Sequence, residues 1–579
     1  MTSYADRPWL KSYDKGVPTS LTIPNKPLAS MLTETAKRVP DAIALVTSAK
    51  VPVAGRLSSN MTYKELDDAS DALASALKEL EVKKGDRVAI VMPNSVAFVI
   101  SFWAILKVGA VVAATNPTYP PDKLAYQIND CDAEVVLCLS MFYKLVKSVQ
   151  SKTKVKTVIV SKYKEYLPPV AKLLFTLTKE KKSDHYLETL ESGDLWFQDL
   201  LSNHAGKKAN VEVSADDLAL FQYTGGTTGV SKAAMSLHKT LVANMLQING
   251  FLQVDKVPGE KEIFLGAIPM FHVYGLVVVV SLAAYLGARI LLAPNARDTN
   301  DVLDIIDTFK PTLYPGVPAL YNAINNHPDV ISGKIDLRSL RVCISGSAPL
   351  PSTTKQEFER LSGAIVCEGF GMSEAPTATH VNPIRGENRV GSIGVPLPEM
   401  DMRIVSLDDG ETDMPIGEVG ELLMAGPNIM QGYHGMPTET ENAIRVKDGK
   451  RWLYTGDIAR MDEDGYFYIV DRKKDMALIG GFNVYPNAVE NVLKAHPAIL
   501  EVGVASVPHP EKEGQETLKA WVVLKPNMTV TAEEPIKHCE GSLAPYEIPR
   551  RFAFIDELPK STVGKTLRRE LIRLEAESN

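Results

Sequence analysis

Short apolar segments alternate with helical patterns through about the first 380 residues of this chain, and this alternation limits the folds open to it most strongly. Residues 87–93 (RVAIVMP) predict a strand, and residues 96–109 (VAFVISFWAILKVG) predict a helix. The pattern repeats with a strand at 133–140, a helix at 141–150 and a strand at 157–161. Such alternation favours parallel sheets covered by helices.

The sequence pattern changes after Pro383, where glycine and proline separate short predicted strands at 400–406, 420–426 and 465–471. These strands predict a smaller, β-rich, barrel-like part. From about Lys474 a helix and further strands follow in an α+β order, which indicates a separate C-terminal domain.

Composition excludes several classes of protein. A length of 579 residues suggests about four folding units. Hydrophobic residues make up 45% and charged residues 23%, which excludes general disorder. The formal charge of −7 argues against a globally basic nucleic-acid binder. Five scattered cysteines without a CxxC pair fit neither a disulfide framework nor a zinc site, so we expect a reduced, intracellular chain.

We predict no signal peptide and no transmembrane helix. The N-terminus has no apolar core segment, and the longest apolar run, residues 273–288, is shorter than the ~18–20 residues that a span needs. Residues 144–182 nevertheless hold eleven lysines and two glutamates around an apolar stretch. We therefore expect the protein in the cytoplasm, with a peripheral contact of residues 144–182 at the inner face of the membrane as one alternative and a solvated basic face as the other.

The strongest local motif is a glycine- and threonine-rich loop. Residues 218–223 predict a strand that runs into the loop at 224–229, and a helical pattern follows from Leu237. Backbone N–H groups and hydroxyls of such a loop can bind an anion. A mononucleotide P-loop is excluded because the residues after Gly229 are Val-Ser-Lys rather than the required Lys-Ser/Thr pair. An ordinary turn remains the alternative.

Three later motifs offer chemistry of the same kind. Glu374 follows a glycine-rich turn where a carboxylate could hold Mg²⁺, and Phe370 could lie on a purine. Asp457 and Arg472 could bind the hydroxyls of a ribose or a phosphate. Lys565 follows Gly564 in a predicted loop near the C-terminus. Each of these residues alone is equally compatible with a structural or solubilising role.

Taken in order, the motifs resemble those of the adenylate-forming superfamily of acyl-CoA synthetases, luciferases and adenylation domains. YTGGTTGVSK resembles the signature phosphate loop, and GFGMSE, YTGD, DRKKD, GGFNVYP and PKSTVGKTLRR match later motifs, from about Pro8 to Leu571. Within the superfamily, PMFHVYG, NPTYPPDKLAYQIND and GGFNVYP are most similar to long-chain fatty acid–CoA ligases.

The resemblance implies an α/β fold with a large N-terminal domain, residues 1–473, and a small mobile α+β C-terminal domain, residues 474–579. The large domain would contain two helix-covered, mostly parallel sheets and the barrel-like part at about 384–473. The implied reaction joins a fatty acid to ATP as an acyl-adenylate, releases pyrophosphate, and then transfers the acyl group to the thiol of CoA. ATP, Mg²⁺ and CoA are thus the expected cofactors and co-substrates, with no nucleic-acid partner and no prediction of oligomeric state.

The resemblance also assigns roles by matching position. The implied catalytic residues are Lys565, between the carboxylate and the α-phosphate, with Glu374, Thr224 and His272; Thr224 and Glu374 would hold Mg²⁺. The implied binding residues are Thr224, Gly225, Gly226, Thr227, Thr228, Gly229 and Lys232 at the phosphates; Gly346, Ser347, Ala348, Glu368, Gly369, Phe370, Gly371, Met372 and Ser373 at the adenine and acyl carbonyl; Asp457, Ile469 and Arg472 toward the ribose; Lys474 at the hinge; and Gly480, Gly481 and Phe482 at the thiol channel. A structural histidine is the alternative for His272.

Three positions depart from the family pattern, and none removes a catalytic group. Phe370 replaces the commoner Tyr, Ser373 replaces Thr, and Gly480 stands where relatives often carry Ser or a basic residue. We keep three other functions open: a ligase that loads a carrier protein, an aryl-CoA ligase of the coumarate type, and a non-catalytic nucleotide-binding scaffold.

Overall fold

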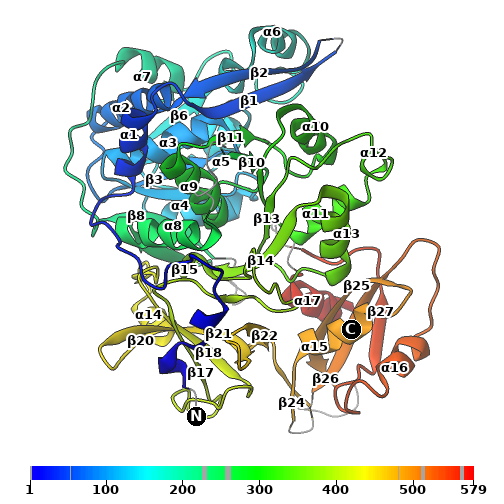
Figure 1. Cartoon of the computed structure of the whole chain (residues 1–579). Coiled ribbons are helices and arrows are strands. Elements are labelled where there is room, and N and C mark those ends of the chain that lie inside the picture. The colour runs from blue at the N-terminus through cyan, green and yellow to red at the C-terminus, as the bar shows by residue number, and fades with distance from the viewer. Residues whose placement is uncertain are drawn as a thin grey trace.

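The computed structural model describes residues 3–52, 54–224, 231–253, 262–479, 482–509, 516–560 and 566–578 (Figure 1). The predictions for Gly225–Gly229, Gly480, Gly481 and Lys565 fall outside these residues. Two large sheets form most of the N-terminal part, a smaller antiparallel sheet follows, and a small α+β unit ends the chain. These parts agree with the predicted fold class.

The first large sheet has eight strands in the order β19-β9-β8-β4-β3-β5-β6-β7. Its strands are β3 (Arg87–Val91), β4 (Val111–Thr115), β5 (Val135–Leu139), β6 (Thr157–Ser161), β7 (Leu195–Trp196), β8 (Leu218–Tyr223), β9 (Ala233–Leu237) and β19 (Gly432–Tyr433). The pairs from β8 to β7 are parallel, whereas β9 and β19 add antiparallel pairs at one edge. Residues of β4 and β5 are entirely buried, as expected for strands covered on both faces.

The second large sheet has nine strands in the order β16-β15-β14-β13-β12-β10-β11-β1-β2. They are β1 (Ile43–Val51), β2 (Gly55–Thr62), β10 (Ile263–Gly266), β11 (Arg289–Leu292), β12 (Leu313–Gly316), β13 (Val342–Ser345), β14 (Ile365–Met372), β15 (Ala375–Val381) and β16 (Val395–Pro396). The pairs from β14 to β1 are parallel, and antiparallel strands close both edges.

Helices lie between the two large sheets and on their outer faces. They are α1 (Ala29–Arg38), α2 (Tyr63–Glu79), α3 (Val96–Lys107), α4 (Pro121–Asp130), α5 (Tyr143–Gln150), α6 (Pro169–Thr178), α7 (Phe197–Asn203), α8 (His238–Leu252), the π-helical η6 (Gly275–Ser281), α9 (Leu282–Leu286), α10 (Thr299–Phe309), α11 (Pro318–Asn325), α12 (Pro328–Ile331) and α13 (Ser352–Ser362). The main core joins Ile90 of one sheet and Ile290 of the other with Phe98 of α3 and Leu241 of α8. This central packing explains why α3 is apolar on every side.

The smaller sheet and the C-terminal unit complete the chain. The sheet contains β17 (Asp401–Val405), β18 (Gly420–Ala425), β20 (Ile444–Lys447), β21 (Lys450–Met461) and β22 (Phe467–Arg472), all paired antiparallel, with α14 (Pro437–Ala443) before β20. The C-terminal unit contains β23 (Ala477–Ile479), β24 (Phe482–Val484), α15 (Pro486–Lys494), β25 (Ile499–Pro508), β26 (Glu516–Leu524), α16 (Glu533–Cys539), β27 (Arg551–Phe554) and α17 (Arg568–Ser578). The predicted domain boundary at residues 473 and 474 stays a prediction.

One local prediction was incomplete. The helix expected from Leu237 begins at His238, but the strand β9 (Ala233–Leu237), which was not predicted, precedes it. This strand pairs with β8 from Tyr223↔Ala233 to Leu218↔Leu237. Pairing across a loop satisfies backbone hydrogen bonds and therefore overrides the helical spacing of the side chains.

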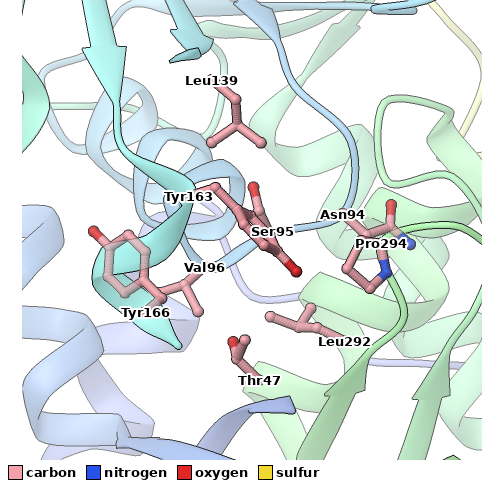
Figure 2. Close-up of a pocket in the computed structure, with 9 residues that line it drawn as sticks. All are labelled: Thr47, Asn94, Ser95, Val96, Leu139, Tyr163, Tyr166, Leu292 and Pro294. Carbon is pink, nitrogen blue, oxygen red and sulfur yellow. The ribbon is translucent and has the colours of Figure 1, made fainter. Parts of the chain in front are cut away.

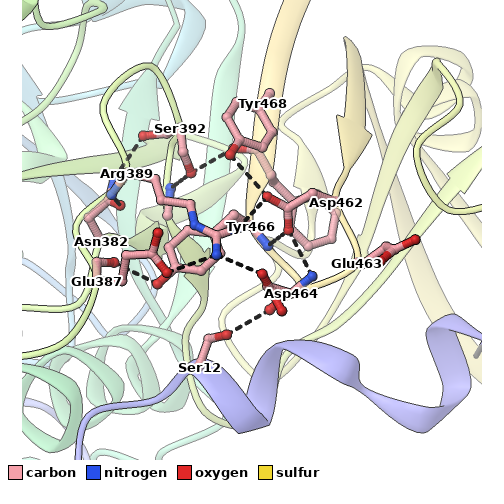
Figure 3. A network of polar contacts seen from close by, with 12 residues as sticks. Ser12, Asn382, Glu387, Arg389, Ser392, Asp462, Glu463, Asp464, Tyr466 and Tyr468 are labelled. Carbon is pink, nitrogen blue, oxygen red and sulfur yellow. Dashed lines mark hydrogen bonds and ion pairs between the residues drawn. The ribbon is translucent and has the colours of Figure 1, made fainter.

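A polar network ties the N-terminal segment to the smaller sheet (Figure 3). Arg389 forms ion pairs with Asp462 at 2.7 Å and Asp464 at 2.6 Å, and its guanidinium lies 4.2 Å from the centre of the Tyr466 ring. Ser12 donates a hydrogen bond to the carbonyl of Asp464 at 2.7 Å. The turn between β21 and β22 is therefore anchored from two distant parts of the chain.

A small cavity lies among the ends of β3, β5 and β11 (Figure 2). Thr47, Ser95, Tyr163 and Tyr166 contribute to its lining, and its volume is about 10 Å³. This volume holds roughly one water molecule. None of the residues predicted to bind nucleotide lines the cavity.

Candidate nucleotide-binding site

Thr224 and Lys232 lie at the two ends of the predicted phosphate loop and are held together by the backbone. The N–H of Thr224 donates to the carbonyl of Lys232 at 2.9 Å. The hydroxyl of Ser231 donates to the carbonyl of Thr224 at 2.6 Å. The loop therefore begins and ends on the paired strands β8 and β9, which fixes both of its ends.

Tyr433 connects Lys232 with Glu374. The Lys232 ammonium forms an ion pair with Glu439 and lies 5.1 Å from the centre of the Tyr433 ring. The Tyr433 hydroxyl donates a hydrogen bond to Glu374 Oε1 at 2.7 Å, and burial, followed by the Glu374 charge, raises the pKa of Tyr433 well above its usual value. The predicted phosphate-binding lysine and the predicted metal-binding carboxylate thus both lie against Tyr433.

Tyr433 and Glu439 were not predicted from the sequence. Tyr433 reaches this place because β19 pairs with β9, at Tyr433↔Ala234, about 200 residues away in the chain. The signal in the sequence was the segment GYHG at residues 432–435, in which an aromatic residue lies close to two glycines. Its partner strand could not be inferred from that signal.

The turn at Gly346, Ser347 and Ala348 adjoins the beginning of the 368–374 segment. Ser345 and Glu368 are partners in the pairing of β13 with β14. A Cβ added to Gly346 would lie 3.3 Å from Tyr274 Cε1 and 3.7 Å from the carbonyl oxygen of Gly369. The turn therefore packs closely against the Tyr274 ring, and Ser347 follows it with a left-handed φ of 71°.

The aromatic and small residues that follow lie mainly on β14. Phe370 packs edge-on against His380, with ring centres 5.9 Å apart, and Met372 ends the strand and pairs with Ala375. Gly371 has no room for a side chain, because a Cβ there would overlap the carbonyl of Thr377. Ser373 and Glu374 form the turn to β15.

Burial alters the protonation of two residues beside this segment. It raises the pKa of Glu368 to about 8, against a weaker opposing hydrogen bond from the Leu350 N–H at 3.4 Å. It lowers the pKa of His272 to about 4, so this histidine is neutral at pH 7. The Tyr274 N–H donates to His272 Nδ1 at 3.3 Å, which orients the ring.

Asp457 and Arg472 face each other across β21 and β22. Asp457 Oδ1 lies 2.6 Å from Arg472 Nε, and the Asp457 side chain is only 2% exposed. The charge of Asp457, and more weakly that of Glu374, raises the pKa of Arg472. Arg472 therefore lies within the field of both carboxylates, and Ile469 lies on the same strand, opposite Ala459.

Lys474 lies near the same charges, whereas Phe482 packs within the C-terminal unit. Desolvation of the Lys474 ammonium, and then the Arg472 charge, lower its pKa. The nearby carboxylates, Asp475 first and then Asp457 and Glu374, oppose this shift. Phe482 stacks on Tyr546 with ring centres 4.5 Å apart. Thr224, Lys232, Glu374, Asp457, Arg472 and Lys474 are thus linked by contact or by charge.

The described residues hold no ready-made metal cage. Within the described ranges, no group of three or more His, Cys, Asp or Glu side chains could hold a metal ion. The oxygens at hand are the Glu374 carboxylate and the Thr224 hydroxyl. This donor set suits a hard cation that shares the oxygens of a bound phosphate.

Comparisons with known proteins define the class to which this site belongs. A family model described as AMP-binding enzyme matches residues 32–434, and one described as AMP-binding enzyme C-terminal domain matches residues 488–565. The chain belongs to the AMP-binding enzyme family.

Individual relatives match nearly the whole chain. It is 38% identical over 576 residues to a long-chain-fatty-acid–CoA ligase of Bacillus subtilis (strain 168), covering 99% of each chain. It is 30% identical over 520 residues to the 4-coumarate–CoA ligase-like 6 protein of Arabidopsis thaliana, covering 89% of this chain and 86% of that one.

Among solved structures, MatB from Rhodopseudomonas palustris resembles this protein in two states. Its ATP-bound structure gives a TM-score of 0.80, and its apo structure gives 0.70. In both comparisons the sequence identity is 27%, with 96% of this chain and all of that chain covered.

Proposed function

We propose that this protein is an AMP-forming fatty acid–CoA ligase. It joins a medium- or long-chain fatty acid to ATP as an acyl-adenylate, releases pyrophosphate, and transfers the acyl group to CoA. The supporting observation is that Thr224, Lys232, Glu374, Asp457 and Arg472 are drawn together from three sheets into one polar site, in a chain 38% identical to a long-chain-fatty-acid–CoA ligase.

Different residues of the chain bind different parts of ATP. Lys232 offers its ammonium to the phosphates once these anions replace Glu439 as its partner. Asp457, oriented by Arg472, accepts hydrogen bonds from ribose hydroxyls. Glu374, held by the Tyr433 hydroxyl, and Thr224 would hold Mg²⁺, which when bound neutralises phosphate charge. Lys565, by its matching position, supplies the cation at which the carboxylate meets the α-phosphate.

In this proposal the acyl group lies beside His272 and Tyr274. The π-helical η6 that follows them, Gly275–Ser281, is fully buried and mostly valine. His272 is neutral at pH 7, so it adds no charge to an apolar acyl chain. These features favour a fatty acid over a charged substrate.

We assign the arrangement of the C-terminal unit to the state in which ATP is bound. The support is the higher TM-score to ATP-bound MatB than to apo MatB, at equal identity and coverage. We take this arrangement as the one that forms the acyl-adenylate, with Lys474 as the hinge for the rotation that precedes thioester formation.

The test is CoA-dependent AMP formation with acetate, octanoate, palmitate and coumarate. Each buried CH₂ contributes about 0.8 kcal/mol, so kcat/KM should rise about fourfold per methylene until the acyl site is full. Turnover of acetate or coumarate equal to that of palmitate contradicts a fatty acid substrate. Transfer to a carrier protein but not to CoA would favour the carrier-loading alternative.

We further propose a peripheral membrane contact through α6. Of the eleven lysines in residues 144–182, seven form ion pairs, which removes most of the apparent charge excess. Lys179, Lys181 and Lys182 are exposed and form no ion pair within the described part of the chain. The basic surface is thus concentrated at the C-terminal end of α6.

An apolar stripe lies along the exposed face of the same helix. Val170, Leu173 and Leu177 are 51%, 60% and 72% exposed, and their spacing places them on one face. The opposite face packs through Ala171 against Val51 of β1, and Figure 1 shows α6 beside the β1–β2 hairpin at the edge of the molecule. An exposed apolar stripe beside free lysines matches an anionic bilayer surface. The described residues contain no helix that is both long and apolar enough to cross a membrane.

Vesicle sedimentation tests this contact. Leu173→Asp should weaken binding to vesicles of phosphatidylglycerol, and added salt should weaken it further, because each lysine contributes ~1 kcal/mol that salt screens. Val446→Asp, at a residue of β20 that is 73% exposed, is the matched control. Absence of binding by the parent protein at low salt ends the membrane proposal and leaves the ligase proposal unaffected.

A further inference from the structure

A buried carboxylate lies at the end of the strand that carries Arg472. Asp471 is 0% exposed, near the end of β22. Its oxygens accept hydrogen bonds from the Asn487 N–H at 2.7 Å and from the Asn487 side-chain amide at 3.1 Å. These two bonds attach the first turn of α15 to the smaller sheet.

Arg568 adds a second attachment from α17. Its guanidinium lies 3.3 Å from Asp471, 3.2 Å from Asp475 and 2.7 Å from Glu490, and it also donates to the side chain of Asn487. The Arg568 side chain is 13% exposed. One guanidinium therefore joins three acids and both helices in a nearly dry cluster.

The order of these residues in the chain gives the cluster its significance. Asp471 precedes Lys474, whereas Asp475, Asn487, Glu490 and Arg568 follow it. The cluster therefore bridges the proposed hinge. Rotation of the C-terminal unit about Lys474 has to rearrange the bonds at Asp471.

The same strand end also carries the nucleotide site. Successive side chains of a strand point to opposite faces. Arg472 accordingly pairs with Asp457 on one side, while Asp471 contacts Asn487 and Arg568 on the other. The C-terminal unit is thus attached to the same segment of backbone that positions Arg472.

We propose that the Asp471–Arg568 contact is a positioning device that holds the C-terminal unit in the adenylate-forming arrangement. This inference rests on the proposed ligase function. In this proposal neither residue touches substrate; both act through the position of the C-terminal unit. Because breaking one partner of a buried ion pair leaves the other charge uncompensated, the contact strongly disfavours intermediate orientations.

The experiment measures the two half-reactions separately in Asp471→Asn and Arg568→Gln. Pyrophosphate exchange should fall ~10-fold or more, because a displacement of about 1 Å at the reacting groups costs up to about 10²-fold. Conversion of supplied acyl-AMP and CoA to thioester should stay within about twofold of the parent, since it does not use the anchored arrangement.

Glu575→Gln is the matched control. Glu575 lies on the same helix, is 6% exposed, and forms ion pairs with Lys519 and with Arg551, the latter at 2.6 Å. These partners all follow Lys474 in the chain. The control should lower Tm without changing the ratio of the two half-reactions.

A spin-label distance provides a readout that does not depend on activity. Labels at Val446 of β20 and Met528 after β26, both exposed, report the position of the C-terminal unit. With ATP present, the distance distribution should broaden in Asp471→Asn and remain narrow in Glu575→Gln.

Equal losses in both half-reactions, or an unchanged distance distribution in Asp471→Asn, would show a merely structural cluster and overturn the proposal. Failure of the proposed function looks different. In that case the parent protein itself shows no pyrophosphate exchange with any acid.

Discussion

The polar cluster at Tyr433 and the polar cluster at Asp471 lie on either side of Arg472 and are built in opposite ways. In the first, Lys232 and Glu439 are 19% and 47% exposed, and the Tyr433–Glu374 contact is one hydrogen bond. In the second, Asp471 is fully buried and Arg568 joins three acids. The difference indicates that ligand anions can open the first cluster, whereas only movement of a whole unit can open the second.

The largest expected effect concerns Lys565, the residue whose matching position puts it between the carboxylate and the α-phosphate. Lys565→Ala should slow acyl-adenylate formation by ~10²–10³, as for loss of one fixed electrostatic stabiliser. Thioester formation from supplied acyl-AMP should continue near the parental rate. Rapid-quench measurement of each half-reaction gives both rates.

Lys560→Ala is the control for Lys565→Ala. Lys560 is also near the C-terminus but forms an ion pair with Glu501. It should leave both half-reactions unchanged. If Lys565→Ala slows both half-reactions equally, the two half-reactions do not use two different arrangements of the C-terminal unit as we propose.

The next effect tests the first cluster. Tyr433→Phe keeps the ring near Lys232 but removes the hydrogen bond that orients Glu374. Loss of such a partner behind a metal ligand typically costs 10–100-fold in metal affinity, so about ten times more Mg²⁺ should be needed to saturate ATP binding. Calorimetric titration of ATP at several Mg²⁺ concentrations measures this directly.

Tyr468→Phe is the matched control, because Tyr468 donates a similar hydrogen bond to Asp462 at 3.0 Å, within the network of Figure 3. Its Mg²⁺ requirement should equal that of the parent. If Tyr433→Phe and the parent depend equally on Mg²⁺, Glu374 does not take part in metal binding as we propose.

A smaller effect of opposite sign is expected from Glu439→Gln. Removing this carboxylate frees Lys232 for the phosphates and should lower the Kd for ATP by about two- to fivefold, within the ~1 kcal/mol of a partly exposed ion pair. The gain should shrink in high salt. Glu441→Gln on the same helix is the control, and weaker ATP binding by Glu439→Gln would show that Glu439 supports the site rather than competing for Lys232.

The smallest effect concerns stability and its dependence on pH. The pKa of Glu368 is raised to about 8 in the folded protein, above its usual value, so the folded state binds the extra proton and loses stability as pH rises toward and through 8. Glu368→Gln should therefore raise Tm relative to the parent at pH 9 and not at pH 4. A Tm difference independent of pH would mean that Glu368 does not retain its proton.

The sequence predicted elements better than contacts. Residues 87–93 and 96–109 gave β3 and α3 because burial on all sides leaves an apolar sequence. Asp457 and Arg472 could be singled out because their motifs are local. The structure pairs them across β21 and β22, and their roles at the ribose stay a prediction. Tyr433 and Arg568 were missed because their partners come from distant strands and helices, and single tyrosines and arginines carry no signal of such pairing.

Charge counting misled for a related reason. The lysine excess in residues 144–182 counted only neighbours in the sequence, whereas Lys147 and Lys156 pair with Asp194 and Glu134 outside that segment. Net charge along a chain therefore overstates the charge on a surface. The exposed lysines after α6 are the part that remains.

The most direct test of the central claim is the identity and ratio of the products. Incubation of the protein with palmitate, ATP, Mg²⁺ and CoA, followed by chromatography, should yield AMP, pyrophosphate and palmitoyl-CoA in equal amounts. Omission of CoA should leave enzyme-bound acyl-AMP with an equal amount of pyrophosphate, and AMP should then be released only slowly. Formation of ADP and phosphate, or of AMP without a thioester, would contradict the account.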